Sequence, residues 1–240
     1  MKSKGNPLIR NALNLAKEES YEAQMTISGT VIKVLLLMII VAVSFMYSYS
    51  ITATTYSSVL TVAFIIGGGV AIVTSFKPKI ARFTAIIYAA VEGFALGAFA
   101  NLLNQVYPGI AMQAVLITII VTVAALIVYG LFPNLASRVQ KFVFVAMLSI
   151  LGIGLVSIIL GFFGIQVPLY GNGSIGIGFS LFVIAIATLS LLIDFDSIVK
   201  GARAGEPKYM EWYCAFGLTV TLIWLYIQIL QLLTQLNSRD

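Results

Sequence analysis

The chain has 240 residues, of which 60% are hydrophobic and only 10% are charged. A soluble domain carries about 25% charged residues, so this composition predicts a protein embedded in a lipid bilayer. The single cysteine excludes a disulfide framework, and the absence of histidine removes His-containing zinc sites and histidine general bases. We therefore expect neither an enzyme nor a protein with a bound cofactor, and the net charge of +5 does not indicate a nucleic-acid partner.

The first 30 residues are expected to form a cytoplasmic N-terminal segment. They lack the short apolar core and the small-residue cleavage site of a signal peptide. Asn6 and Pro7 are typical of a helix start, and the apolar residues that follow share one helical stripe. The pattern predicts a short amphipathic helix on the membrane surface, and the alternative is an unstructured tail.

Residues 31–240 are expected to form one transmembrane domain. Seven apolar runs are long enough to cross a ~30 Å hydrocarbon core as helices, which takes roughly 20 residues each. Their continuity excludes the alternating segments of a transmembrane β-barrel. The expected spans are 31–50, 57–76, 83–104, 110–132, 141–164, 174–199 and 210–235. The predicted fold class is an all-α integral membrane protein with seven transmembrane helices.

Basic residues alternate between the two sides of this predicted bundle. The N-terminal segment and the second, fourth and sixth loops carry lysine and arginine, whereas the first, third and fifth loops carry none. The positive-inside rule then places the N-terminus in the cytoplasm and the C-terminus outside. The loop residues that carry this pattern are Lys77, Lys79, Arg82, Arg138, Lys141, Lys200, Arg203 and Lys208.

Glycines in the spans predict close approach between helices. For Gly67 to Gly69 in the second span, the alternative is a helix break that lines a cavity, as in discontinuous transporter helices. The other candidates are Gly93 and Gly97 in the third span and Gly152, Gly154, Gly161 and Gly164 in the fifth.

Two aspartates close the sixth span, after a long run without charge. An ionised acid in a membrane segment costs roughly 2.5 to 3.5 kcal/mol on insertion scales, so Asp194 and Asp196 need a partner, a wet cavity or a cation. Asp194 shares a small, polar stripe with Ser190 and Ser197, as a helix facing a bundle interior should. Asp196 points elsewhere, and Lys200 at i+4 predicts an ion pair for it. Asp194 is therefore the stronger candidate for an ion or proton site.

Glu92 is expected ~15 Å deep in the third span, close to the membrane midplane. The spans hold no basic residue at that depth, so its carboxyl group is protonated, hydrogen-bonded or serving a cation. Tyr88, one turn away, is the hydrogen-bond candidate. An acid at this depth indicates a functional site by default, and the alternative is a protonated glutamate bonded to a neighbouring helix.

Glu211 opens the seventh span at a level similar to that of Asp194, across a short loop that makes the two helices antiparallel neighbours. It is either a further ion-binding carboxylate or a solvated acid that the helix N-terminus favours. On the same helix Thr221, Gln228 and Gln235 recur every seven residues, which predicts a polar seam for packing or for an ion path.

Several sequence motifs resemble the transmembrane Bax inhibitor motif family, most closely its bacterial YccA-like branch. They are the opening Asn-Pro, VEGFALG, Tyr107-Pro108-Gly109, LIDFD, GEPKYMEWYCAFG and WLY, and they cover nearly the whole chain. The resemblance implies six helices around a central seventh, a location in the bacterial cytoplasmic membrane, and a pH-sensitive calcium leak.

In better-known members of this family, an aspartate on the sixth helix shares a proton with one on the seventh, and deprotonation opens the path. Asp194 matches the first aspartate, but Thr221 stands roughly where the second is expected. Glu211, Asp196 or Glu92 is then the candidate to replace it.

Three functions follow as hypotheses. The first is a pH-sensitive cation leak or transporter that carries calcium or protons, because carboxylate oxygens suit hard cations. The second is a membrane protein that transports nothing and modulates a membrane protease or another complex. The third, an intramembrane hydrolase, is disfavoured because Asp194 and Asp196 face apart and form no aspartyl dyad.

Overall fold

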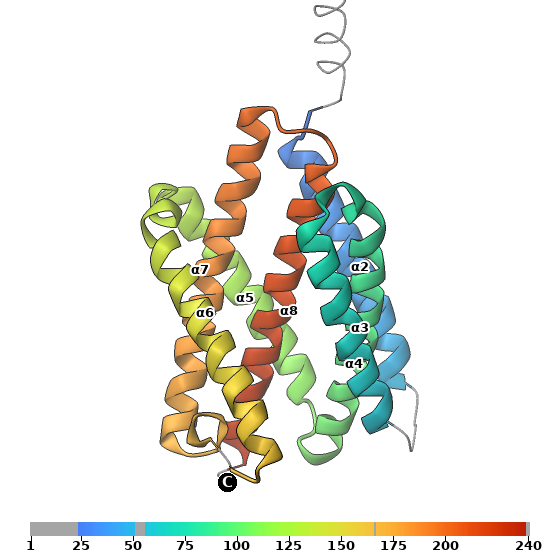
Figure 1. Cartoon of the computed structure of the whole chain (residues 1–240), viewed down its shortest axis with the longest axis vertical. Coiled ribbons are helices and arrows are strands. Elements are labelled where there is room, and N and C mark those ends of the chain that lie inside the picture. Colours follow the sequence, from blue (N-terminus) through green and yellow to red (C-terminus); the bar gives the residue numbers. More distant parts are fainter. Residues whose placement is uncertain (1–23, 51–55, 166, 239–240) are drawn as a thin grey trace, which may run out of the picture.

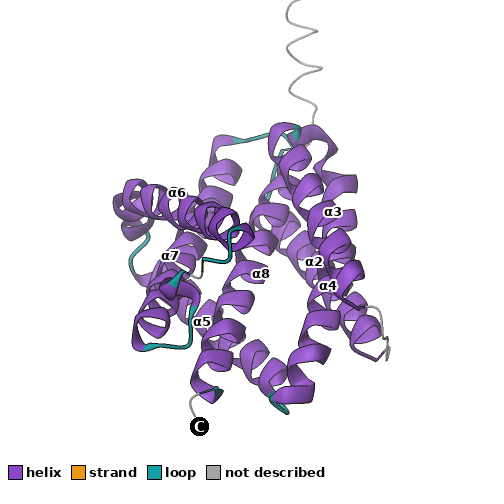
Figure 2. Cartoon of the chain, turned by 60° about the horizontal axis from the view of Figure 1, so that its bottom comes forward, coloured by secondary structure: helices purple, strands orange, loops and turns teal. Residues whose placement is uncertain are grey.

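The structure is a computed structural model that describes residues 24–50, 56–165 and 167–238. Within these ranges the chain forms seven long helices and no sheet (Figures 1 and 2). The helices are α2 (Ile27–Ser50), α3 (Tyr56–Phe76), α4 (Ala81–Val106), α5 (Ile110–Leu131), α6 (Asn134–Phe162), α7 (Ser174–Ala204) and α8 (Met210–Asn237). Two short 3₁₀ turns, η1 (Pro78–Ile80) and η2 (Pro168–Tyr170), precede α4 and α7.

All seven predicted helices are confirmed, and their ends differ from the predicted ones. The helix α6 begins at Asn134, directly after Pro133, and so includes polar residues that precede its apolar run. The helix α7 extends to Ala204 and includes Lys200 and Arg203. Hydropathy marks the part of a helix that lies in lipid, whereas the helix itself continues until a proline or glycine ends it.

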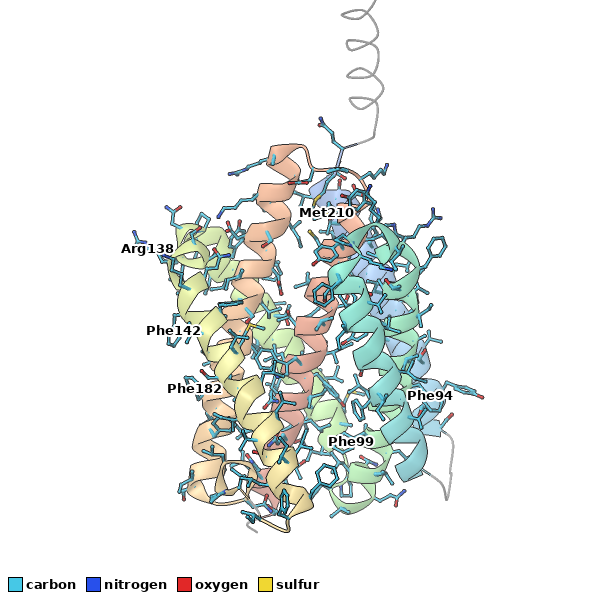
Figure 3. The ribbon with its side chains drawn as sticks, in the orientation of Figure 1. Phe94, Phe99, Arg138, Phe142, Phe182 and Met210 are labelled. Atoms are coloured by element: carbon cyan, nitrogen blue, oxygen red, sulfur yellow. The ribbon has the colours of Figure 1, made fainter. Side chains whose placement is uncertain are left out.

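Six of the helices are long and apolar enough to cross a membrane, and α3 adds a shorter apolar stretch over Val62–Phe76. Large apolar side chains cover the outside of the bundle. Phe142 and Phe182 point outward from α6 and α7 (Figure 3), with exposed fractions of 56% and 45%. Such a surface is suited to lipid chains rather than water.

The helix α8 passes through the middle of the bundle and packs against α2, α4, α5 and α7 (Figure 1). The helix α3 packs chiefly on α4, and α6 packs chiefly on α7. The expected central seventh helix is therefore present, but four neighbours rather than six form most of its surroundings. Most of the residues that it buries are apolar, and Leu225 and Leu230 among them are fully buried.

The third-span glycines allow α4 to approach α2 closely. A Cβ atom at Gly93 would lie 2.8 Å from the Cα of Val41, and one at Gly97 would lie 2.9 Å from the Cα of Phe45. Real Cβ atoms do not approach backbone so closely, so both positions require glycine. This confirms the packing interpretation for Gly93 and Gly97.

The fifth-span glycines behave differently. Among the described residues, nothing lies within 4 Å of a Cβ built at Gly152, Gly161 or Gly164. The predicted close packing is therefore wrong for these three positions. The helix α3 is continuous through Gly67, Gly68 and Gly69, so the alternative of a helix break is also wrong.

The antiparallel pairing of α7 and α8 follows from one turn. Gly205 adopts a left-handed conformation with φ of +70° and ends α7, where its N–H donates to the carbonyl of Ala202 at 3.3 Å. Glycine takes this conformation without steric cost. The chain then needs only a short loop to begin α8 at Met210. The expected packing of α7 against α8 as antiparallel neighbours is confirmed.

Residues 24–26, which precede α2, lie against the turn between α7 and α8. Gln24 forms an isolated antiparallel bridge with Pro207, and the N–H of Met25 donates to the carbonyl of Glu206 at 2.7 Å. Met25 is buried, with its sulfur close to Gly201. The predicted amphipathic helix after Asn6 lies outside the described residues.

Candidate functional site

Asp194 lies on the inward side of α7, on the small and polar face that the sequence predicts. Ala187 and Ser190 on this face are buried, whereas Ser197, beyond the aspartate, is exposed. The Oδ2 atom of Asp194 is buried and has no hydrogen-bond partner among the described residues. A buried carboxylate oxygen without a partner is costly, so it indicates a site for a proton, a water molecule or a cation.

Thr221 and Cys214 of α8 face the Asp194 carboxylate. The threonine hydroxyl lies beside it, but donates to the carbonyl oxygen of Gly217 at 3.2 Å. The free thiol of Cys214 is close enough to interact electrostatically with Asp194. Thr221, which stands roughly where the resemblance places a second aspartate, therefore lies across from Asp194.

Among the described residues, the two serines of the α7 stripe form no hydrogen bond with Asp194. Ser190 donates to the carbonyl of Ile186 at 3.0 Å and contacts the sulfur of Met147 at 3.4 Å. Ser197 donates to the carbonyl of Ile193 at 2.8 Å. Both hydroxyl groups satisfy their own helix backbone, and of the two only Ser190 is buried.

Asp196 has the ion pair that the sequence predicts. Its Oδ2 lies 2.5 Å from Nζ of Lys200, and the hydroxyl of Tyr129 donates to its Oδ1 at 3.4 Å. Lys200 also donates to Ser137 at 2.9 Å. These contacts join the ends of α5, α6 and α7, so a local structural role explains this carboxylate.

Glu211 is buried and paired rather than solvated. Its side chain is only 1% exposed and forms an ion pair with Lys33 of α2. The N–H and the hydroxyl of Thr26 each donate to its Oε1 at 2.9 Å. A Cβ at Gly29 would lie 2.6 Å from the carboxyl carbon, so that glycine makes room for the acid.

The expectation of a solvated acid at this position is therefore wrong. Glu211 joins the start of α8 to the start of α2, and Lys33 also lies 5.5 Å from the ring centre of Trp212. Because its carboxylate is fully paired, Glu211 is not the missing partner of Asp194.

Glu92 is the deeper of the two candidate carboxyl groups, and unlike Asp194 it has no fully buried oxygen atom left without a partner among the described residues. It is 6% exposed and lies between α4 and α3, where a Cβ at Gly67 would lie 3.0 Å from its carboxyl carbon. Tyr88 is near enough to interact electrostatically but packs its ring edge-on against Phe216, with centroids 5.2 Å apart. The predicted hydrogen bond from Tyr88 is not present.

The polar seam of α8 continues toward its other end. Gln235 is buried, accepts a hydrogen bond from Ser180 at 2.8 Å and donates to the carbonyl of Gly171 at 3.2 Å. Tyr226 is also buried, and its hydroxyl oxygen has no hydrogen-bond partner in the described part of the chain. Gln235 of the predicted seam is therefore a satisfied packing group, whereas Tyr226 lies outside that seam.

The site is a set of separate carboxyl groups and not a preformed metal centre. The described residues contain no group of three or more Cys, Asp or Glu side chains that is able to hold a metal ion. Asp194 and Glu92 each offer a single carboxyl group. Such a site suits a proton or a cation in transit better than a resident metal.

Sequence reasoning missed the partners of Glu211. Lys33 is 178 positions away from it in the chain, and Gly29 and Thr26 are similarly distant. The available signal was that Lys33 lies inside an apolar run, where an unpaired basic residue is as costly as an acid. Gly67, which receives the Glu92 carboxyl group, was noticed only as a member of a glycine run.

The comparisons with known proteins agree with the resemblance seen in the sequence. A family model described as "Bax inhibitor 1 like" matches residues 6–238. Neither a curated protein nor a solved structure matches the chain.

Proposed function

The chain belongs to the Bax inhibitor 1-like family, and from this membership and the geometry at Asp194 we propose that it is a pH-sensitive cation leak of the membrane. In this proposal calcium is the transported ion, the N-terminus is cytoplasmic and the C-terminus lies outside. The alternating basic loops support the orientation. A bacterial cytoplasmic membrane is the proposed location.

The observation that carries the proposal is the unpartnered Oδ2 of Asp194 between α7 and α8. When this carboxyl group is protonated, α7 and α8 pack without an internal charge. When it ionises, a negative charge in the bundle attracts a cation and water, because no ion pair within the described residues involves Asp194. Flux should therefore rise as the pH rises.

The residues of α8 that face Asp194 determine how steeply the flux depends on pH. Thr221 is neutral, and Cys214 is the titratable group described near the carboxylate. Without a second carboxylate, no proton is shared between two acids. We therefore propose that one carboxyl group titrates alone, with at most a tenfold change in the ratio of its ionised to protonated forms per pH unit.

Glu92 supports the proposal as a second, deeper carboxyl group. It is buried near the middle of α4, where Gly67 of α3 leaves room for its carboxyl group. Glu92 and Asp194 both lie on helices that contact α8. We propose that Glu92 is a relay position for the ion or proton.

Radioactive calcium uptake into proteoliposomes at two pH values tests the proposal. Vesicles with the wild-type chain should take up calcium faster than protein-free vesicles, and their uptake should be faster at the higher pH than at the lower pH. Asp194→Asn should remove the pH dependence, and Asp196→Asn is the matched control because Asp196 is already paired with Lys200. Equal uptake with and without protein would overturn the proposal.

A second function, modulation of a membrane protease or another complex without transport, is favoured by a different observation. Gln24 and Met25 are attached to the α7–α8 turn through Pro207 and Glu206. A partner that binds the N-terminal segment is therefore coupled to the helices that carry Asp194. A co-purifying partner that is lost on deletion of residues 1–25, together with no ion flux, would favour this function.

A further inference from the structure

We propose that the groove between the start of α2 and the end of α7 is a binding site for an anionic phospholipid. The groove has a volume of about 740 Å³ and opens at one end of the bundle. Its walls are Met25, Thr26, Ile27, Ser28, Val31 and Ile32 from one side and Ala202 and Arg203 from the other. This inference rests on the membrane location of the chain and not on ion transport.

Charge in the groove favours an anionic headgroup. Arg203 is exposed and has no ion pair among the described residues. No groove residue is acidic, and the nearby carboxylate that Thr26 contacts, Glu211, is already paired with Lys33. A guanidinium group forms paired hydrogen bonds with phosphate oxygens, so the headgroup phosphate is the natural partner of Arg203.

The apolar wall favours a lipid over a free phosphate ion. Ile27, Val31, Leu35 and Ile39 follow one another at steps of four along α2 and are 45%, 47%, 58% and 63% exposed. They form a ridge ~18 Å long at 1.5 Å per residue, which is comparable to half of a ~30 Å hydrocarbon core. An acyl chain is therefore able to lie along α2 while its headgroup stays at Arg203.

The location of the groove agrees with this occupant. The last turn of α7 and the first turn of α2 lie at the same end of the bundle (Figure 1), next to the loop that joins α7 to α8. Basic pockets between helices at this level typically bind anionic lipid headgroups. A lipid bound here would bridge α2 and α7.

The test is the thermal unfolding of the purified full-length chain in detergent with added lipid. Dioleoylphosphatidylglycerol should raise Tm and dioleoylphosphatidylcholine should not, because its phosphate is neutralised by its own choline. Arg203→Gln should weaken the phosphatidylglycerol effect so that roughly tenfold more lipid is needed for the same shift. Arg138→Gln should retain it, because Arg138 projects from the start of α6, away from α2 (Figure 3).

Two further arms keep the test decisive. Val31→Trp narrows the groove without altering its charge and should also weaken the lipid effect, since Val31 is half exposed and tolerates substitution. Inorganic phosphate and glycerol phosphate should give no shift. Equal stabilisation by both lipids, a full effect of free phosphate, or an unchanged response of Arg203→Gln would overturn the proposal. A lipid effect that appears only after deletion of residues 1–23 would also overturn the proposal. It would show that this segment, and not a lipid, occupies the groove in the full-length chain.

Discussion

Thr221 of α8 lies beside the carboxylate of Asp194 on α7, yet its hydroxyl donates to the carbonyl of Gly217 and leaves Asp194 Oδ2 without a partner. The acid is thus buried opposite a neutral residue. In the family arrangement that the sequence resembles, this position is a second aspartate, which would share a proton with the first. In this chain the residue that faces Asp194 is a threonine.

Restoring the second acid should change the pH response. In Thr221→Asp, the carboxyl groups of residues 194 and 221 face each other between α7 and α8, and they cannot both ionise at low cost. We expect the pH at which calcium uptake is half-maximal to rise by about one unit or more. Uptake measured over a pH series checks this, with Thr221→Asn as the uncharged control. An unchanged midpoint would show that the two positions are not coupled.

The buried Glu211–Lys33 pair should make a large contribution to stability. Lys33→Met leaves Glu211 buried without its cation, which typically costs about 3–5 kcal/mol. Thermal unfolding in detergent should show a marked fall in Tm for this variant. The double variant Lys33→Met/Glu211→Leu should lose much less than the sum of the two single changes, because neither charge then remains alone. Additive losses would show that the two side chains are not energetically coupled.

Close packing of α2 on α4 should make Gly97 intolerant of any side chain. A Cβ there meets the backbone of Phe45, so Gly97→Ala forces the helices apart and should cost about 1–3 kcal/mol of unfolding free energy. Gly130→Ala is the matched control, because nothing lies within 4 Å of its Cβ position. Equal Tm values for the two variants would contradict the close approach.

Gly67 allows a test of Glu92 that leaves the acid in place. A Cβ at Gly67 would meet the Glu92 carboxyl group, whereas one at Gly68 would meet open space. We expect Gly67→Ala to displace the carboxyl group and to lower calcium uptake in the same direction as Glu92→Gln. Gly68→Ala should leave uptake unchanged. If Gly67→Ala and Gly68→Ala behave alike, Glu92 has no role that depends on its position.

The sequence predicted those features that depend on neighbouring residues or on burial in lipid. Hydropathy found the seven helices, i,i+4 spacing found the pair of Asp196 with Lys200, and helical periodicity placed Asp194 on the inner face. Small residues at two helical positions also predicted the contact of Gly93 and Gly97 with a neighbouring helix. Each of these follows from the geometry of a single helix.

Features that depend on the order of helices in space were not predictable. Nothing in the local pattern around Glu211 indicates that Lys33 of α2 lies beside it, because that requires knowing that α2 packs against α8. For the same reason the sequence pattern does not show that α6 lies at the edge of the bundle, where, within the described chain, Gly152 and Gly161 face no neighbouring helix. Single-sequence patterns show which face is small or polar, but not which helix covers it.

The central claim is that ionisation of Asp194 opens a path for cations, and calcium uptake into proteoliposomes at about pH 6 and about pH 8 tests it most directly. The account predicts faster uptake at the higher pH for the wild-type chain and for Asp196→Asn, and a low uptake independent of pH for Asp194→Asn. Uptake that still depends on pH, unchanged, in Asp194→Asn would contradict the account.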